Sequence, residues 1–132
     1  MSENRRILNI GIASLDEIKA NTIAVARGER RPGADEPKVW FTSIESLAQV
    51  LSTRNSALLE LIAQRKPQSV AELAALSGRE TSNLSRTLST LARYGLVTFE
   101  RGEGGRKVPR VVYDEIRLRV PLDTAPASSR AA

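Results

Sequence analysis

Hydrophobic positions in the first part of the chain predict a strand followed by a helix. Residues 6–12 (RILNIGI) are rich in Ile and Leu and alternate loosely with polar positions, which is typical of a short strand. Residues 14–27 carry apolar side chains at spacings of three and four, which predicts an amphipathic helix. Ser14 and Glu17 have the spacing of a capping box, in which each side chain bonds a free amide at the helix start.

A second strand and a second helix are expected before position 52. Residues 28–37 are rich in Gly, Pro and charge, which predicts a loop, and residues 38–41 (KVWF) are strand-like. Thr42 and Glu45 repeat the capping-box spacing ahead of a short apolar run, so a helix follows. A unit of about fifty residues has little core of its own. We therefore expect residues 1–52 to dimerise or to bind a partner.

The next segment predicts three helices in close succession. Residues 54–65 show helical periodicity and end at a proline, which disfavours helical angles in the residue before it. Ser69 and Glu72 again have capping-box spacing, and Gly78 stands where a helix ends in a left-handed turn. A third helix is expected over residues 81–94. The order helix, helix, tight turn, helix is that of a helix-turn-helix.

A β-hairpin is predicted after the third helix. Residues 96–101 and 106–113 are strand-like and are joined by a glycine-rich turn. Apolar and basic residues alternate over residues 116–120, which predicts a further strand. Three helices followed by a hairpin form a winged helix, in which the hairpin is the wing.

These elements predict an α+β protein with two parts and a tail. A small N-terminal strand-helix-strand-helix extension, residues 1–52, precedes a winged helix-turn-helix domain over residues 53–122. Residues 123–132 (DTAPASSRAA) are small and polar, so a disordered tail is expected.

The third helix has two contrasting faces. At about 100° per residue, Leu84, Leu88 and Leu91 fall on one narrow stripe that must face the core. The opposite side and its flanks carry hydroxyls, an amide and arginines, at Ser82, Asn83, Arg86, Ser89, Thr90 and Arg93.

That polar face suits the major groove of DNA. Arginine can bond guanine through two hydrogen bonds and asparagine can do the same with adenine, while Ser and Thr reach base edges or phosphates. The N-terminal part of such a helix usually enters the groove, and basic residues around the glycine turn suit a wing over residues 101–110 that follows the backbone. The residues expected to contact double-stranded DNA are Arg79, Thr81, Ser82, Asn83, Arg86, Thr87, Thr90, Arg93, Arg106 and Lys107.

The charge distribution agrees with this assignment. The 132 residues include 20 Lys and Arg against 15 Asp and Glu, a net charge of +5. Residues 1–52 carry seven basic and seven acidic side chains, whereas residues 79–110 carry seven basic and three acidic. A neutral half joined to a basic half indicates that one part assembles while the other meets a polyanion.

The run SVAELAALSGRETSNLSRTLSTLARYGLV resembles the helix-turn-helix of winged-helix transcriptional regulators of the MarR/ArsR-like type. The resemblance covers roughly residues 53–120. It implies that Ser82, Asn83 and Arg86 read bases and that Arg106 and Lys107 contact the backbone. The preceding run KVWFTSIESLAQVLSTRNSALLELI is similar to a narrower group, the DNA-binding antitoxins of toxin–antitoxin operons, although Arg54-Asn55 stands where that group often has a proline.

Two function classes remain open, and a third is disfavoured. A homodimeric transcriptional repressor is the first, and an antitoxin that neutralises a small toxin through its N-terminal half, with DNA binding for autoregulation, is the alternative. An enzyme is not expected, because the chain has no Cys and no His and no catalytic constellation is apparent. We likewise expect no metal, no cofactor and no membrane contact, and a cytoplasmic location.

Overall fold

A computed structural model describes residues 5–33 and 36–122, and the chain divides into two units. Unit 1 combines the N-terminal segment through Leu47 with the segment from Glu115 onward, and unit 2 is Ala48–Asp114. Unit 1 is therefore discontinuous in sequence. The mixed helix and strand content expected from the sequence is confirmed, while the expected tail over residues 123–132 lies outside the described residues.

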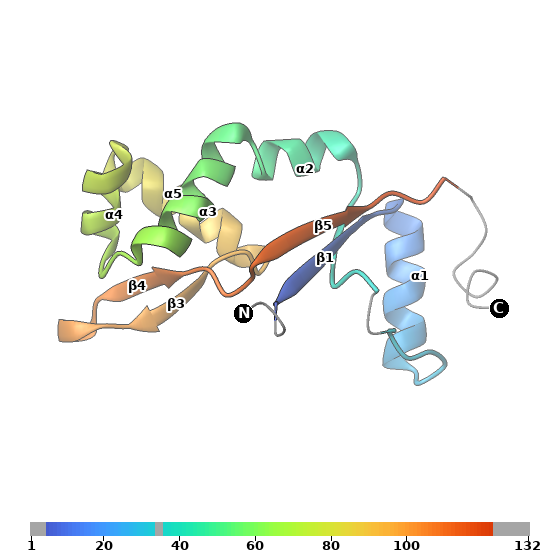
Figure 1. The fold of residues 1–132 in the computed structure, drawn as a ribbon. Coiled ribbons are helices and arrows are strands. Elements are labelled where there is room, and N and C mark those ends of the chain that lie inside the picture. The colour runs from blue at the N-terminus through green and yellow to red at the C-terminus, as the bar shows by residue number, and fades with distance from the viewer. Residues whose placement is uncertain (1–4, 34–35, 123–132) are drawn as a thin grey trace. The chain divides into compact units, whose positions relative to one another are not determined.

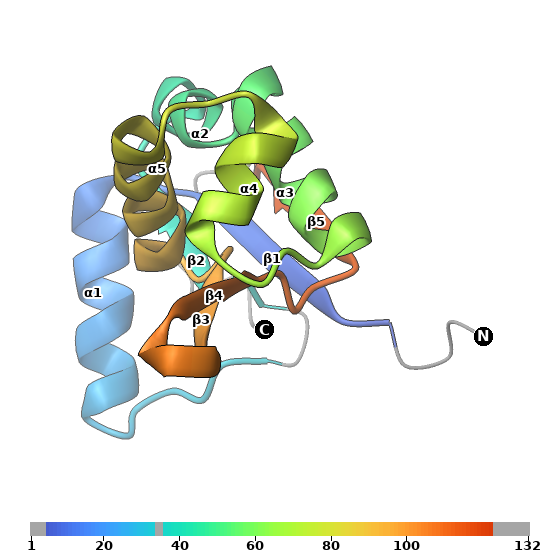
Figure 2. The same cartoon turned by 90° about the vertical axis from the view of Figure 1, so that its left-hand side faces the viewer.

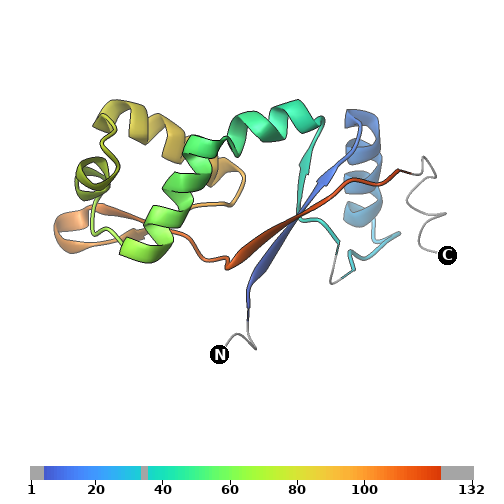
Figure 3. The same cartoon turned by 45° about the horizontal axis from the view of Figure 1, so that its top comes forward.

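Unit 1 is built on a parallel sheet of three strands, with β1 (Ile7–Ile12) between β2 (Val39–Phe41) and β5 (Glu115–Arg119). Figures 1 and 3 both show β1 and β5 side by side. Leu8 and Ile10 are buried, because a central strand is covered on both edges by its neighbours and on its apolar face by side chains.

The position of β5 corrects the predicted domain boundaries. The sequence analysis assigned residues 53–122 to one domain, but β5 pairs with β1, with Leu8 opposite Ile116 and Ile10 opposite Leu118. The boundary therefore falls at Asp114/Glu115. Alternation of apolar and basic residues identified the strand and its two faces, but a pairing between residues more than a hundred positions apart leaves no local signal.

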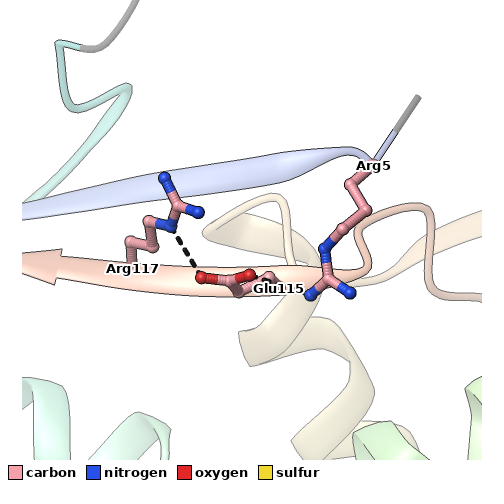
Figure 4. Close-up of polar contacts among 3 residues, drawn as sticks. All are labelled: Arg5, Glu115 and Arg117. Atoms are coloured by element: carbon pink, nitrogen blue, oxygen red, sulfur yellow. Dashed lines mark hydrogen bonds and ion pairs between the residues drawn. The ribbon is translucent and has the colours of Figure 1, made fainter. Parts of the chain in front are cut away.

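A cluster of three charged side chains joins the start of β5 to the segment before β1 (Figure 4). The Glu115 carboxylate accepts hydrogen bonds from Arg5 Nη2 at 2.8 Å and from Arg117 Nε at 2.6 Å. These two bonds, that of Arg117 first, hold the pKa of Glu115 below its usual range. These side chains are largely open to solvent, so the cluster contributes little to the free energy of unfolding.

Unit 1 also contains α1 (Leu15–Ala26) and, at its end, α2 (Ile44–Val50), which continues into unit 2. The capping box of α1 is confirmed, with Glu17 N donating to Ser14 Oγ at 3.2 Å and Ser14 N to Glu17 Oε1 at 3.3 Å. The cap predicted for α2 was wrong by one residue: Ser43 Oγ, not Thr42, accepts from the amide, that of Ser46, at 3.0 Å. Ser and Thr are both good caps, so spacing alone did not separate them.

Gly11 allows the Trp40 ring to lie directly against the sheet. The two residues are register partners on adjacent strands. A Cβ atom at Gly11 would lie 2.5 Å from Trp40 Cζ3 and 2.9 Å from Pro37 Cγ. The absence of a side chain at Gly11 is therefore what admits the indole at this place.

We expect Gly11→Ala to lower the free energy of unfolding by about 1–3 kcal/mol, because the new methyl group displaces the rings of Trp40 and Pro37. Chemical denaturation followed by Trp40 fluorescence measures the change. Gly33→Ala is the matched control, since a Cβ there meets nothing within 4 Å. Equal stability of the two variants would contradict this packing.

After the end of α2, unit 2 contains three helices, which are α3 (Thr53–Arg65), α4 (Val70–Ser77) and α5 (Thr81–Arg93) (Figure 2). Two left-handed residues end the first two of them: Lys66, just before Pro67, has φ 45° and Gly78 has φ 72°. The Gly78 amide donates to Ala74 O at 2.9 Å, which closes α4.

An antiparallel hairpin follows, with β3 (Thr98–Arg101) and β4 (Lys107–Arg110) joined by the short 3₁₀ turn η1 (Glu103–Gly105). The buried apolar side chains of unit 2 come from the end of α2, from α3 to α5 and from the chain around the hairpin. They include Val50, Leu58, Leu59, Ile62, Leu73, Leu84, Leu88, Leu91, Leu96, Val97 and Val108. No helix within the described part of the chain is long and apolar enough to cross a membrane.

Candidate nucleic-acid interface

Helix α5 presents one apolar and one polar face, as its sequence predicted. Leu84, Leu88 and Leu91 are at most 1% exposed, and α5 packs against α4. The residues of the polar face that are exposed are Thr81, Ser82, Asn83, Ser85, Arg86, Ser89 and Arg93, while Thr87 and Thr90 are half-buried. The inward leucines therefore fix which side chains of α5 point to solvent.

Arg79 lies in the turn before α5 and bonds three side chains at once. Its Nη2 donates to Asn83 Oδ1 at 2.9 Å and to Thr87 Oγ1 at 2.8 Å. Its Nε also donates to Asn83 Oδ1, at 3.2 Å, and its Nη1 donates to Asn55 Oδ1 of α3 at 3.4 Å. The guanidinium thus links α3, the turn and the first two turns of α5.

The surroundings of Arg79 lower the pKa of its guanidinium, first through partial burial and second through the positive charge of Arg54. The charge of Arg54, at the start of α3, therefore acts on Arg79. Asn55 is held in turn, because its Nδ2 donates to Val50 O at 3.0 Å. Sequence reasoning missed both residues as parts of this site, since nothing in the local pattern of α3 marks a contact with a turn 24 positions later.

Three of the residues predicted to contact DNA are therefore engaged with one another. Asn83 Oδ1 already accepts from Arg79, so the Asn83 amide cannot offer both its acceptor and its donor to an adenine while that bond persists. Thr87 accepts from the same guanidinium. The geometry makes Arg79 a positioning residue for the polar face of α5.

Among the other predicted residues of α5, Ser82, Arg86 and Arg93 are exposed and open to a ligand. Within residues 5–33 and 36–122, the side chains of Ser82, Arg86 and Arg93 make no hydrogen bond or ion pair. Thr90 Oγ1 donates to the Arg86 carbonyl at 3.2 Å, within the helix. Arg86 and Arg93 are thus the two cations of α5 that are exposed and have no internal partner in this part of the chain.

The hairpin brings together further basic groups. Arg101 and Lys107 are opposite each other across β3 and β4, and Arg106 is exposed beside them. Lys107 Nζ lies 5.6 Å from the centre of the Phe99 ring, a cation–π arrangement that leaves the ammonium open to solvent on its other side. The turn depends on Gly104 and Gly105, whose φ angles of 68° and 75° suit glycine.

Arg110, by contrast, points inward. Its Nη1 donates to Pro67 O at 2.7 Å and to Pro109 O at 2.9 Å, and its Nε lies 3.8 Å from Glu100 Oε1. It fastens the hairpin to the chain that follows α3. The sequence grouped Arg110 with the basic wing, but in the structure its role is to hold the wing in place.

We expect Arg79→Ala to lower the free energy of unfolding by about 1–2 kcal/mol, because several polar groups lose a charged donor. Arg79→Lys is expected not to restore stability, since an ammonium lacks the planar fork that reaches three acceptors. Urea denaturation followed by circular dichroism measures both variants. Arg86→Ala is the control, because it removes the same charge from a side chain without internal bonds. If all the variants were equally stable, the hydrogen bonds of Arg79 would not contribute to the stability of the protein.

The chain belongs to the HVO_A0114 family, whose model matches residues 50–118, which span all of unit 2 beyond its first residues and most of β5. No curated protein matches the sequence. Among solved structures, the chain is similar to a predicted DNA-binding transcriptional regulator from E. coli, with 17% identity and a TM-score of 0.45 over 76% of this chain and 86% of that chain. No cluster of metal-ligating side chains occurs among the described residues.

Proposed function

We propose that this protein is a non-enzymatic, sequence-specific regulator of transcription, a repressor, that binds double-stranded DNA. In this proposal unit 2 is a winged helix-turn-helix domain, α5 is its recognition helix and the hairpin is its wing. The observation that carries the proposal is the free, exposed Arg86 on the polar face of α5, with an exposed basic wing in the same unit. Arginine is the side chain that most often specifies guanine in the major groove.

Each group of residues has its own task in this proposal. Arg86 reads a base, because its fork can bond guanine O6 and N7 together. Thr81 and Ser82 lie in the first turn of α5. Their hydroxyls and the free amides of the helix N-terminus favour the binding of a phosphate. Arg106 and Lys107 neutralise phosphates beside the site, and the Arg79 network keeps α5 and α3 in register.

We further propose that the repressor is a homodimer formed through unit 1. Apolar side chains on two elements of this unit support the dimer: Leu15 and Ile23 of α1 are 54% and 49% exposed, and Leu118 of β5 is 47% exposed. Strand β5 lies at an edge of the three-stranded sheet. Two copies would place two recognition helices on half-sites about one turn of DNA apart, which raises specificity.

A salt titration tests the proposed binding mode. Fluorescence anisotropy of a labelled duplex is expected to show affinity falling linearly on a log–log plot, with a slope of about −0.9 for each phosphate neutralised. Arg106→Ala and Lys107→Ala should each make the slope shallower by about 0.9, the value for one phosphate contact. Lys19→Ala, which removes an exposed cation of α1, should leave the slope unchanged. An affinity that does not change with salt would overturn the proposal.

A further inference from the structure

The side-chain amide of Asn83 is held in one orientation by its neighbour Arg79. A guanidinium has only donors, so the amide atom that lies 2.9 Å from Arg79 Nη2 and 3.2 Å from Arg79 Nε must be the oxygen. The opposite orientation would bring the NH₂ group of the amide against two other donors. The amide of Asn83 therefore cannot turn over while the guanidinium stays in place.

Arg79 is itself held from the other side by Asn55. The Val50 carbonyl can only accept, and Asn55 Nδ2 donates to it at 3.0 Å, which leaves Asn55 Oδ1 to face Arg79 Nη1 at 3.4 Å. Arg79 Nη2 also donates to Thr87 Oγ1 at 2.8 Å, one turn along α5 from Asn83. The orientation of the Asn83 amide thus follows from a chain of bonds that begins at a backbone carbonyl, and the whole chain lies in unit 2.

This arrangement leaves the NH₂ group of Asn83 available to a ligand. Asn83 is exposed on α5, and its Nδ2 has no hydrogen-bond partner within residues 5–33 and 36–122. Its Oδ1 already accepts two hydrogen bonds, which occupy both lone pairs of the oxygen. Asn83 is therefore a side chain that can only donate, although an unrestrained asparagine both donates and accepts.

Base edges in the major groove differ in what they offer to such a donor. Guanine presents two acceptors, N7 and O6, and thymine presents one, O4, whereas cytosine presents only the donor N4. Adenine presents an acceptor beside a donor, and the usual contact of asparagine with adenine needs both atoms of the amide. A side chain that only donates favours guanine and thymine, loses the two-bond contact with adenine, and is mismatched with cytosine.

We propose that Asn83 reads one base as a donor only, selecting guanine or thymine, and that Arg79 sets this choice by fixing the amide. The inference rests on the proposed function, in which α5 lies in the major groove. It adds a second specificity-determining residue to Arg86, and it makes Arg79 a positioning residue for base choice. Residues three apart on a helix are neighbours, so Asn83 and Arg86 read neighbouring bases.

A pool of random duplexes supplies the probe for the test, because the protein itself selects its preferred site from the pool. Anisotropy titrations then compare that site with duplexes in which each base pair is replaced in turn. The position read by Asn83 is the one at which Asn83→Ala loses the preference of the wild type. At this position the wild type should bind guanine or thymine about threefold to tenfold more tightly than cytosine.

Asn83→Asp should reverse that order while it leaves the network in place. A carboxylate keeps the bonds from Arg79 and presents its second oxygen as an acceptor, which matches the donor N4 of cytosine. The measured quantity is the ratio of the affinities of one variant for two duplexes. The new negative charge weakens binding to both duplexes alike, so it does not change this ratio.

Arg79→Ala tests the role of the guanidinium. Without it the amide of Asn83 turns freely, so adenine at the same position should gain about threefold to tenfold in affinity relative to guanine and thymine. Arg54→Ala is the control, because it removes a positive charge that acts on Arg79 and has no hydrogen bond to Asn83 in the described part of the chain. This control should keep the wild-type order of bases. Circular dichroism checks that each variant is folded.

The possible outcomes separate this inference from the proposed function. If the pool yields no preferred site, the proposed function fails and the inference fails with it. If a site is found, three results would each overturn the inference while the proposed function stands. These are an Asn83→Ala variant that keeps every base preference, an Asn83→Asp variant that keeps the wild-type order, and an Arg79→Ala variant that gains nothing at adenine.

Discussion

Replacing Arg86 with alanine is expected to weaken binding to the preferred DNA site by about 1–3 kcal/mol, which is about fivefold to 150-fold, and to relax base preference at one position. The side chain is exposed on the polar face of α5 and makes no bond within the described residues, so it can bond a base without breaking an internal contact. Anisotropy titrations with the preferred site and with single-base variants of it measure both effects.

Arg27→Ala provides the control for charge, since it removes one positive charge from an exposed position just after α1. It should leave base preference unchanged. Arg86→Ala should also unfold at the same denaturant concentration as the wild type, because surface substitutions rarely exceed about 0.5 kcal/mol. If the affinity and the base preference of Arg86→Ala were both unchanged, Arg86 would not be the residue that reads a base.

Leu88→Ala is expected to lower the free energy of unfolding by about 2–5 kcal/mol. Leu88 is 1% exposed and stands between Leu84 and Leu91 on the inward stripe of α5. The substitution removes buried apolar contact and leaves a cavity beneath α5, so the polar face loses its support as well. Urea denaturation monitored by circular dichroism gives the stability, and anisotropy then gives the loss of DNA binding.

Ser89→Ala is the matched control, because Ser89 is the next residue along the helix and is exposed. Its stability should stay within about 0.5 kcal/mol of the wild type. If Leu88→Ala were as stable as Ser89→Ala, the leucine stripe would not hold α5 in place. The claim that these leucines orient its polar face toward solvent would then be wrong.

Features that depend on neighbouring residues were predictable from the sequence. The leucine spacing located α5 and its two faces, and Ser14 with Glu17 located the start of α1. Gly78 marked the end of α4, since only a left-handed residue fits there. Each of these signals acts within one or two helical turns, which is why pattern and spacing were sufficient.

Features that depend on distant residues were not predictable. The partner of β5 is decided by packing against β1, and the alternation of residues 116–120 is compatible with a place in either unit. The contact of the Trp40 ring with Gly11 likewise requires the register of β1 and β2, which the sequence of either strand alone does not encode.

The contrast between Arg79 and Arg86 illustrates the same limit within the candidate site. Both were predicted from the sequence to contact DNA. The structure directs Arg79 toward Asn55 and Thr87 and leaves Arg86 facing solvent. The difference depends on α3, whose position beside the turn no local pattern encodes.

The most direct test of the central claim compares two duplexes, one that spans the region upstream of the protein's own coding sequence and one with the same bases in scrambled order. Anisotropy is measured for each at low and at high salt. We expect tight binding to the upstream duplex that survives in part at high salt, and weak binding to the scrambled duplex that high salt abolishes. Equal binding to both duplexes, or none to either, would contradict it and would favour a protein partner for unit 1.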